Sequence, residues 1–341
     1  MKRSFPELEE LEILRSKKTP YGSHRLEAEI HHSGEIFPIY SFSFGVEDRS
    51  LPTVAFFGGV HGLERIGTRL LIAYLQSLHQ LLSWDRVTKE LLKVCRVHFY
   101  PLVNPVGMYL NSRSNGDGID LMRNAPVEAP NRSKYQLFAG HRISPRLPWY
   151  RGPEGQPMAA EAQAVVDFVK RELWGAKVAQ SLDVHSGFGS RDRLWFPYAR
   201  SSEEFGNAPE AMSLKALLDE TYPNHIYKVE PQSHQYTAHG DLWDYLYDEY
   251  RTEKRPGIFI PWSLEMGSWI WVKKNPKQLF SRAGVFNPML PHRRQRVLRR
   301  HVTLFDFLIR AVISNANWAF LPPQKREQLW VQAKKEWYGG E

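Results

Sequence analysis

The chain has 341 residues, of which 42% are hydrophobic and 24% charged, a composition typical of one large soluble α/β domain without repeats. It has no run of about 18 apolar residues, no apolar region behind its basic first residues and one cysteine, Cys95, so we expect no membrane partner, no signal peptide, no internal disulfide and a cytoplasmic location. The net charge of +8, from 45 basic and 37 acidic residues, allows anionic partners, but no nucleic-acid-binding motif accompanies it and we do not expect nucleic acid as a partner.

Segments with the periodicity of strands alternate along the chain with segments that have the periodicity of helices. Strands are predicted at 26–44 (a hairpin that turns at Ser33-Gly34), 53–57, 94–103, 177–184 and 257–264. Helices are predicted at 7–18, 66–82, 159–173, 208–222, 241–249 and 294–315. The basic run at 292–301 opens the last helix opposite apolar positions such as Val297 and Leu308, and we interpret it as a solvated helix face.

This order of elements predicts an α/β fold. Connections of crossover length favour a three-layer α/β/α sandwich around a mixed, mostly parallel twisted sheet. We expect a helical extension at 1–22, one main domain at 23–318 and a polar tail at 319–341. The irregular stretch at 108–157 is rich in Asn, Gly, Pro and Arg, and loops of this length are usually functional; whether it closes over a site is left open.

Polar residues follow several of the predicted strands. His61 and Glu64 are three residues apart, a spacing that puts two side chains on one face of a helical turn, although this pair alone is a weak signal. His185 and Glu265 follow two further strands, and the carboxyl ends of parallel strands meet at one edge of a sheet. Two imidazoles and one carboxylate, from His61, Glu64 and His185, would form a zinc site with an open coordination position.

Further motifs occur in a fixed order around these residues. They are Gly-Gly-x-His61-Gly-x-Glu64, Asn104-Pro-x-Gly107, Arg113-x-Asn115, Gly118-Ile-Asp120-Leu-x-Arg123-Asn124, His185-Ser-Gly, the loop Tyr236-Thr-Ala-His-Gly240-Asp-Leu-Trp-Asp244, and Glu265. In this order and spacing, about residues 50–315 resemble the zinc carboxypeptidase family, the M14 metallopeptidases of the carboxypeptidase A type. The resemblance implies the sandwich fold, a catalytic domain at 23–318 and one Zn²⁺ per chain.

The resemblance also implies a catalytic role for individual residues. His61, Glu64 and His185 match the metal ligands. Glu265 matches the general base that takes a proton from water and returns it to the leaving amine. Arg113 matches the cation that stabilises the developing oxyanion.

Substrate-binding roles follow from the same resemblance, with two departures. Arg123 and Asn124 match positions that bind the terminal carboxylate of the substrate, where a guanidinium can bind bidentately, and Tyr236 matches the tyrosine that closes over it. Met122 stands where the family has an Asn, and a thioether cannot donate a hydrogen bond, so we expect a weakened or rebuilt carboxylate site. Trp243 holds a position that influences side-chain preference in the family and predicts an apolar or small substrate group.

The favoured interpretation is a zinc-dependent hydrolase that cleaves an amide bond next to a free carboxylate in a peptide. An N-acyl-amino-acid deacylase of the succinylglutamate desuccinylase or aspartoacylase type is an alternative that Met122 favours, whereas the Tyr236 loop favours the peptidase. A catalytically silent binding protein on the same scaffold is a further alternative, although the ligand and base positions are all filled. The natural substrate and the oligomeric state are left open.

Overall fold

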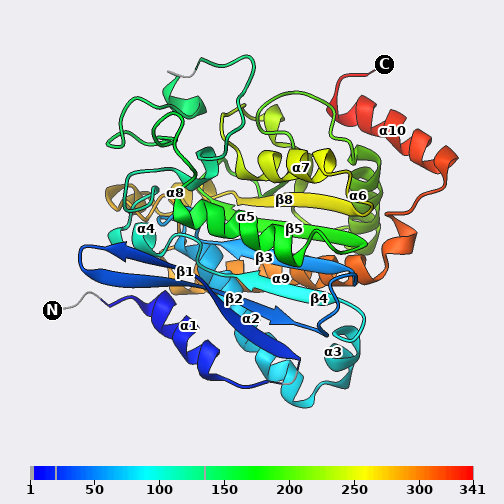
Figure 1. The fold of residues 1–341 in the computed structure, drawn as a ribbon, viewed down its shortest axis with the longest axis horizontal. Coiled ribbons are helices and arrows are strands. Elements are labelled where there is room, and N and C mark those ends of the chain that lie inside the picture. The colour runs from blue at the N-terminus through cyan, green and yellow to red at the C-terminus, as the bar shows by residue number, and fades with distance from the viewer. Residues whose placement is uncertain (1–3, 20, 134–135, 341) are drawn as a thin grey trace.

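The structure is a computed structural model that describes residues 4–19, 21–133 and 136–340 (Figure 1). Residues 1–3, 20, 134–135 and 341, which belong to the expected 1–22 extension, the 108–157 stretch and the 319–341 tail, lie outside the described residues. Its strands are β1 (Gly22–His32), β2 (Glu35–Phe44), β3 (Thr53–Gly58), β4 (Arg96–Tyr100), β5 (Val178–Ser186), β6 (Arg193–Phe196), β7 (Lys228–Pro231) and β8 (Ile258–Met266). Its α-helices are α1 (Pro6–Ser16), α2 (Arg65–Trp84), α3 (Arg86–Leu91), α4 (Pro105–Leu110), α5 (Ala160–Glu172), α6 (Ala208–Thr221), α7 (Leu242–Thr252), α8 (Trp269–Lys274), α9 (Pro291–Ile313) and α10 (Pro323–Trp337).

The eight strands form one mixed sheet in the order β1-β2-β4-β3-β5-β8-β6-β7. The four central strands, β4, β3, β5 and β8, run parallel to one another. The predicted hairpin of β1 and β2 flanks them on one side, where β2 pairs antiparallel with β4, and β6 pairs antiparallel with β8 on the other. Every residue of β3 and β5 is buried, because central parallel strands are covered on both faces of the sheet.

Two successive residues of β3 show the three layers. Phe56 stacks on Phe305 of α9, with ring centroids 4.3 Å apart, on the face of the sheet that α2 and α9 cover. Phe57 points to the opposite face, where it contacts Phe168 of α5 at 5.7 Å and Trp243 of α7 at 5.0 Å. Successive strand residues face opposite sides of a sheet, so the expected α/β/α sandwich is confirmed.

The N-terminal helix is anchored to the main domain by a buried carboxylate. Glu7 of α1 has no exposed surface and forms ion pairs with Arg65 (2.6 Å) and Arg69 (2.9 Å) of α2. A buried carboxylate needs such partners, and here they tie the beginning of the described chain to the helix that follows the His61 turn.

Residues 319–340, expected to be a polar tail, instead contain helix α10, which packs on α6 (Figure 1). Trp337 is buried, its ring lies 4.7 Å from that of Phe196, and its Nε1 donates to the carbonyl of Val229. A helix that buries only one narrow stripe of residues can have a polar composition overall, so the polar composition of this segment did not exclude a packed helix.

Strands β6 and β7 lie where no strand was predicted. Each has four residues, too few to show a clear period of two. None of the helices in the described part of the chain combines the length and the apolarity needed to cross a bilayer.

Candidate metal centre and active site

The turn between β3 and α2 carries His61 and Glu64. The N–H of Glu64 donates to the carbonyl of His61 at 2.9 Å, and α2 begins at the next residue, so the pair lies on a tight turn before the helix rather than on the helix itself. Gly62 in this turn lies against Gly107, and a Cβ at Gly62 would come within 2.0 Å of the Gly107 carbonyl carbon. This close approach explains the glycines of both motifs.

The register of the central sheet places the other two polar residues. In the parallel pairing of β5 with β8, His185 lies opposite Glu265 at the carboxyl ends of both strands. Gly58, the last residue of β3, lies opposite Val184, so the turn that follows β3 is beside the end of β5. The structure therefore brings the four residues to one edge of the sheet, as strand-end positions predict.

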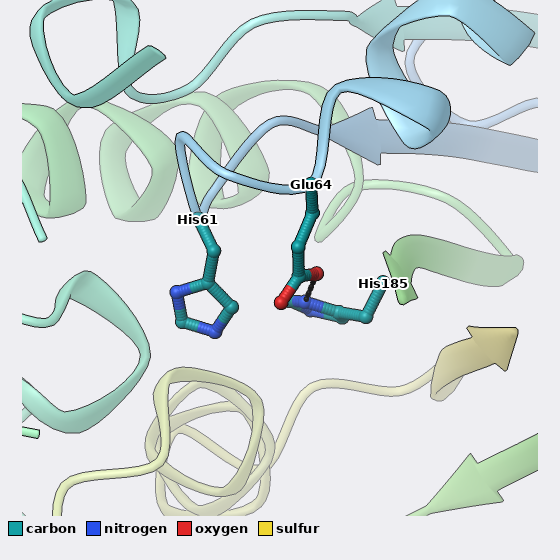
Figure 2. Close-up of side chains that lie close together, drawn as sticks. All are labelled: His61, Glu64 and His185. Carbon is teal, nitrogen blue, oxygen red and sulfur yellow. Dashed lines mark hydrogen bonds and ion pairs between the residues drawn. The ribbon is translucent and has the colours of Figure 1, made fainter. Parts of the chain in front are cut away.

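His61, Glu64 and His185 point toward one another (Figure 2), and each offers a ligand atom within 4.8 Å of the others. Oε2 of Glu64 accepts a hydrogen bond from the N–H of Ser186 at 2.9 Å and lies 3.2 Å from Nδ1 of His185. All three ligand candidates are buried. Nδ1 of His61 lies 3.7 Å from Oδ1 of Asp120 and has no hydrogen-bond partner among the described residues.

This donor set fits zinc. Two imidazoles and one carboxylate are a common ligand set for catalytic zinc, and buried polar atoms without a partner, such as Nδ1 of His61, are rare in proteins unless something else satisfies them. We therefore assign His61, Glu64 and His185 as the residues that could hold the ion.

The ionisable groups of the site have pKa values shifted in opposite directions. Burial, reinforced by the Glu64 carboxylate, raises the pKa of Glu265 to about 8. Burial opposes the protonation of His185, but the carboxylates of Asp183 and Glu64 outweigh it and raise the pKa of His185 well above its ordinary value. Burial lowers the pKa of His61. Shifts of this kind within one cavity are typical of functional sites.

Arg113 lies directly against the ligand candidates. Its Nε donates to Oδ2 of Asp120 at 2.8 Å, its Nη2 lies 2.8 Å from Nε2 of His61, and its Nη1 lies 3.5 Å from Oε1 of Glu64. Asp120 has no exposed surface and also accepts from the N–H of Met122. A fixed, buried carboxylate thus holds the guanidinium beside the site.

Arg123 and Tyr236 meet on another wall. Nη2 of Arg123 lies 3.4 Å from the hydroxyl of Tyr236, and its guanidinium lies 5.8 Å from the centre of the tyrosine ring. Nη1 donates to the carbonyl of Met122 at 3.0 Å and lies 3.5 Å from Oδ2 of Asp241. Nε of Arg123 is buried without a hydrogen-bond partner in the described part of the chain, which leaves this cation with unused donor capacity.

A cavity of about 560 Å³ joins these groups. The ionisable side chains of the lining are those of His61, Glu64, Arg113, Arg123, His185, Tyr236 and Glu265, all of which were candidate site residues in the sequence. Apolar side chains form most of the remaining wall, among them Leu63, Met122, Phe138, Trp149, Phe188, Trp195 and Phe286. The cavity is thus largely apolar with a few convergent charged groups, as ligand sites usually are.

Two residues predicted to bind substrate do not line this cavity. The amide of Asn124 donates to the carbonyl of Arg151 at 2.7 Å and accepts from the N–H of Ala159, so it holds two loop segments together. Trp243 is buried in α7, and its indole donates to Asp183 at 2.9 Å. Trp243 was expected at the substrate pocket, but the structure places it away from this cavity, because helix α7 begins at Leu242 and the indole is directed into the core.

Sequence reasoning missed the aromatic wall and Asp183. Phe188, Trp195 and Phe286 come from loops and a short strand that no periodicity marks. Asp183 had a visible signal, because it lies two residues before His185 on one strand and so projects from the same face.

Comparisons with known proteins agree with this geometry. A family model described as zinc carboxypeptidase matches residues 18–267. The carboxypeptidase N catalytic chain of Mus musculus is 24% identical over 220 residues, which cover 60% of this chain and 46% of that protein. Carboxypeptidase E of Caenorhabditis elegans is 29% identical over 121 residues, which cover 27% of this chain and 26% of that protein. The matches thus span about half the length, or less, of these curated relatives.

Solved structures show the same fold. Bovine thrombin-activatable fibrinolysis inhibitor, in complex with tick carboxypeptidase inhibitor, matches with a TM-score of 0.61 at 18% identity, over 91% of this chain and 95% of that chain. Carboxypeptidase A from Helicoverpa armigera matches with a TM-score of 0.52 at 19% identity, over 76% of this chain and 62% of that chain.

Proposed function

This chain belongs to the zinc carboxypeptidase family, and we propose that it is a zinc-dependent hydrolase that cleaves an amide bond next to a free carboxylate. The observation that carries the proposal is the convergence of His61, Glu64 and His185 within 4.8 Å beside Glu265 and Arg113 in one cavity. When bound by the three ligands, zinc would polarise the scissile carbonyl and lower the pKa of a water molecule.

Glu265 would act as general base and then as general acid. Its Oε1 accepts a hydrogen bond from the N–H of Phe188 at 2.9 Å, which fixes the carboxyl group at the cavity wall. Burial raises the pKa of this carboxyl group toward neutrality, and a group with such a pKa can both accept and return a proton, which efficient general acid–base catalysis requires.

The two arginines would each bind a different negative charge of the substrate. Arg113, held by Asp120, would stabilise the negative charge that develops on the carbonyl oxygen, because its position is fixed before the reaction. Arg123 has unused donor capacity beside Tyr236 and would bind the free carboxylate of the substrate. The apolar wall would exclude water and accept an uncharged side chain.

The proposal is tested with blocked dipeptides that carry a free terminal carboxylate and with their amidated counterparts. We expect the purified protein to contain one zinc ion per chain and to cleave only the free acids. 1,10-Phenanthroline should abolish turnover, and added Zn²⁺ should restore it. Protein without zinc would contradict the proposal, whereas protein that binds zinc but turns over no substrate would favour the silent binding protein.

A second candidate is an N-acyl-amino-acid deacylase. Met122 lines the cavity beside Arg123 and cannot donate to a carboxylate, so the site offers fewer donors than the resemblance implies. Parallel assays with N-acetyl and N-succinyl amino acids separate the two candidates, because turnover of these compounds alone would replace the peptidase proposal.

A further inference from the structure

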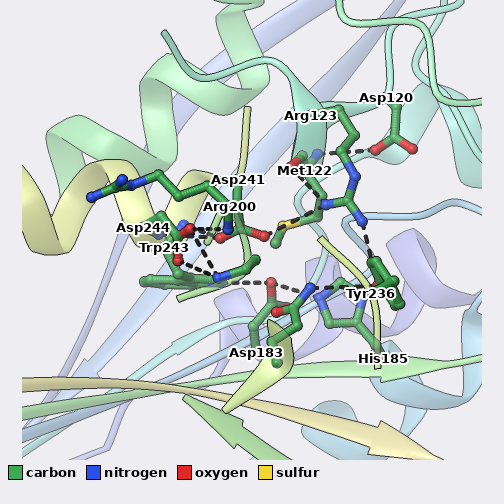
Figure 3. A network of polar contacts seen from close by, with 12 residues as sticks. Asp120, Met122, Arg123, Asp183, His185, Arg200, Tyr236, Asp241, Trp243 and Asp244 are labelled. Atoms are coloured by element: carbon green, nitrogen blue, oxygen red, sulfur yellow. Dashed lines mark hydrogen bonds and ion pairs between the residues drawn. The ribbon is translucent and has the colours of Figure 1, made fainter. Parts of the chain in front are cut away.

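The ligand candidate His185 belongs to a line of polar contacts with two further buried side chains, Asp183 and Trp243 (Figure 3). Nε1 of Trp243 donates to Oδ2 of Asp183 at 2.9 Å, and the same oxygen lies 2.9 Å from Nε2 of His185. The other ring nitrogen of His185, Nδ1, lies 3.2 Å from Oε2 of Glu64. His185 therefore has one nitrogen against Asp183 and the other directed toward the ligand set.

The surroundings of Asp183 make its hydrogen bond with Trp243 important. The carboxylate has no exposed surface, and its neighbours across the sheet are Phe57 on β3 and Ser263 on β8. A carboxylate in such surroundings is costly unless it accepts hydrogen bonds. Its Oδ1 has no partner among the described residues, and Oδ2 receives the indole N–H. Trp243 thus determines where the charged oxygen lies.

Contact between Asp183 and His185 has a consequence for the tautomer of the imidazole. A carboxylate next to Nε2 favours the proton on Nε2 and leaves the lone pair of Nδ1 free. In the structure the ring N–H is not aligned with the line from Nε2 to Oδ2, so the hydrogen bond from Trp243 is the contact that fixes the carboxylate.

We propose that Asp183 and Trp243 are positioning residues for the metal: Trp243 anchors Asp183, and Asp183 holds His185 with the Nδ1 lone pair directed toward the space between the three ligand candidates. This inference rests on the proposed zinc site and adds two residues to it. Neither residue lines the cavity, so both act through His185. Carboxylate partners of metal-binding histidines typically change metal affinity by about 10–100-fold.

A purely structural role for Trp243 is the competing explanation, because its ring packs on Phe57 at 5.0 Å. Trp262 provides a matched control. It is also buried, and its Nε1 also donates to a side chain of β5, Oε1 of Gln180, at 2.8 Å. Gln180 lies near the other end of β5, away from His185.

The experiment compares Trp243→Phe, Asp183→Asn and Trp262→Phe in the full chain. Zinc affinity is measured by competition with a chromophoric chelator, and thermal unfolding is measured on the metal-free proteins. We expect Asp183→Asn to weaken zinc binding about 10–100-fold and Trp243→Phe about 10-fold. Trp262→Phe should lower thermal stability to a similar extent as Trp243→Phe and leave zinc affinity unchanged.

Nitrogen-15 NMR of the zinc-loaded protein reports which ring nitrogen of His185 carries the proton. A purely structural role of Trp243 and Asp183 would leave this signal unchanged. We expect His185 to carry its proton on Nε2 in the wild type and in Trp262→Phe, and a mixed or altered signal in Asp183→Asn. Unchanged zinc affinity and an unchanged His185 signal in both Asp183→Asn and Trp243→Phe would overturn the inference while the zinc site stands. Wild-type protein that binds no zinc would overturn the proposed function and the inference together.

Discussion

The candidate active-site cavity and a second cavity differ in how their charges are paired. The active-site cavity has a volume of about 560 Å³, and a second cavity of about 710 Å³ lies between the β1–β2 hairpin and the end of α5. In the second cavity Glu172 is fully engaged: Nη2 of Arg96 lies 2.6 Å from it and Nε of Arg171 lies 2.8 Å from it. Burial would raise the pKa of Glu172, but these hydrogen bonds lower it to about 2.

Glu265 in the active-site cavity behaves in the opposite way. Its pKa is raised to about 8 because burial and a like charge outweigh its hydrogen bond. In the larger cavity, arginines and a carboxylate therefore form ion pairs with one another. In the smaller cavity, the Glu265 carboxyl group has no such cationic partner among the described residues to lower its pKa below the ordinary value. Ionisable groups without matched partners, more than cavity volume, therefore distinguish the candidate active site.

The largest effect should come from Glu265→Gln. Losing the general base is expected to lower kcat by about 10²–10⁴-fold, and because Glu265 is not a proposed ligand, zinc content should stay at one per chain. Steady-state kinetics and metal analysis measure both. Full activity in this variant would show that the unmet charge of Glu265 has no catalytic meaning.

Glu172→Gln is the matched change in the other cavity. It should leave kcat and KM unaltered but lower the free energy of unfolding by about 3 kcal/mol, because it leaves Arg96 buried without its ion pair. Urea denaturation measures the loss, with Glu220→Gln at an exposed position as the control. A fall in kcat comparable to that of Glu265→Gln would break the distinction between the two cavities.

Arg123→Lys should raise KM about 10-fold for substrates with a free carboxylate, since an ammonium cannot reproduce bidentate binding. The variant keeps the charge, so amidated substrates should remain as poor as they are for the wild type. An unchanged KM would mean that the substrate carboxylate binds elsewhere, for instance at Arg113.

The smallest effect concerns acid stability. The pKa of Glu172 lies below its ordinary value of 4.5, at about 2 in the folded chain, so the unfolded chain binds the proton more readily between these values. The stabilisation is fully present above about pH 4.5 and is lost as the pH falls toward 2. We expect the stability difference between wild type and Glu172→Gln to shrink over that range in urea titrations; a constant difference would contradict the assignment.

The sequence allowed much of the fold and most of the site to be predicted, because long periodic segments and strand-end polar residues follow from backbone geometry. The ligand candidates His61, Glu64 and His185 all reached one cavity. Trp243 could not be placed, since whether a loop residue faces a cavity or a core depends on where helix α7 begins. The aromatic wall from Phe188 to Phe286 depends on tertiary packing of irregular segments, which no local pattern encodes.

The origin of the three ligand candidates has a consequence for how the protein folds. His185 is separated from Glu64 by a long stretch of chain, and the two meet only when β3 and β5 pair in parallel. Non-local parallel pairing is slow, because the closure of a long loop must precede the contacts that reward it. Zinc would therefore have no complete binding site early in folding, and its stabilisation would act on the finished sheet. The ion would slow unfolding more than it hastens folding, so metal removal should shorten the lifetime of the native state.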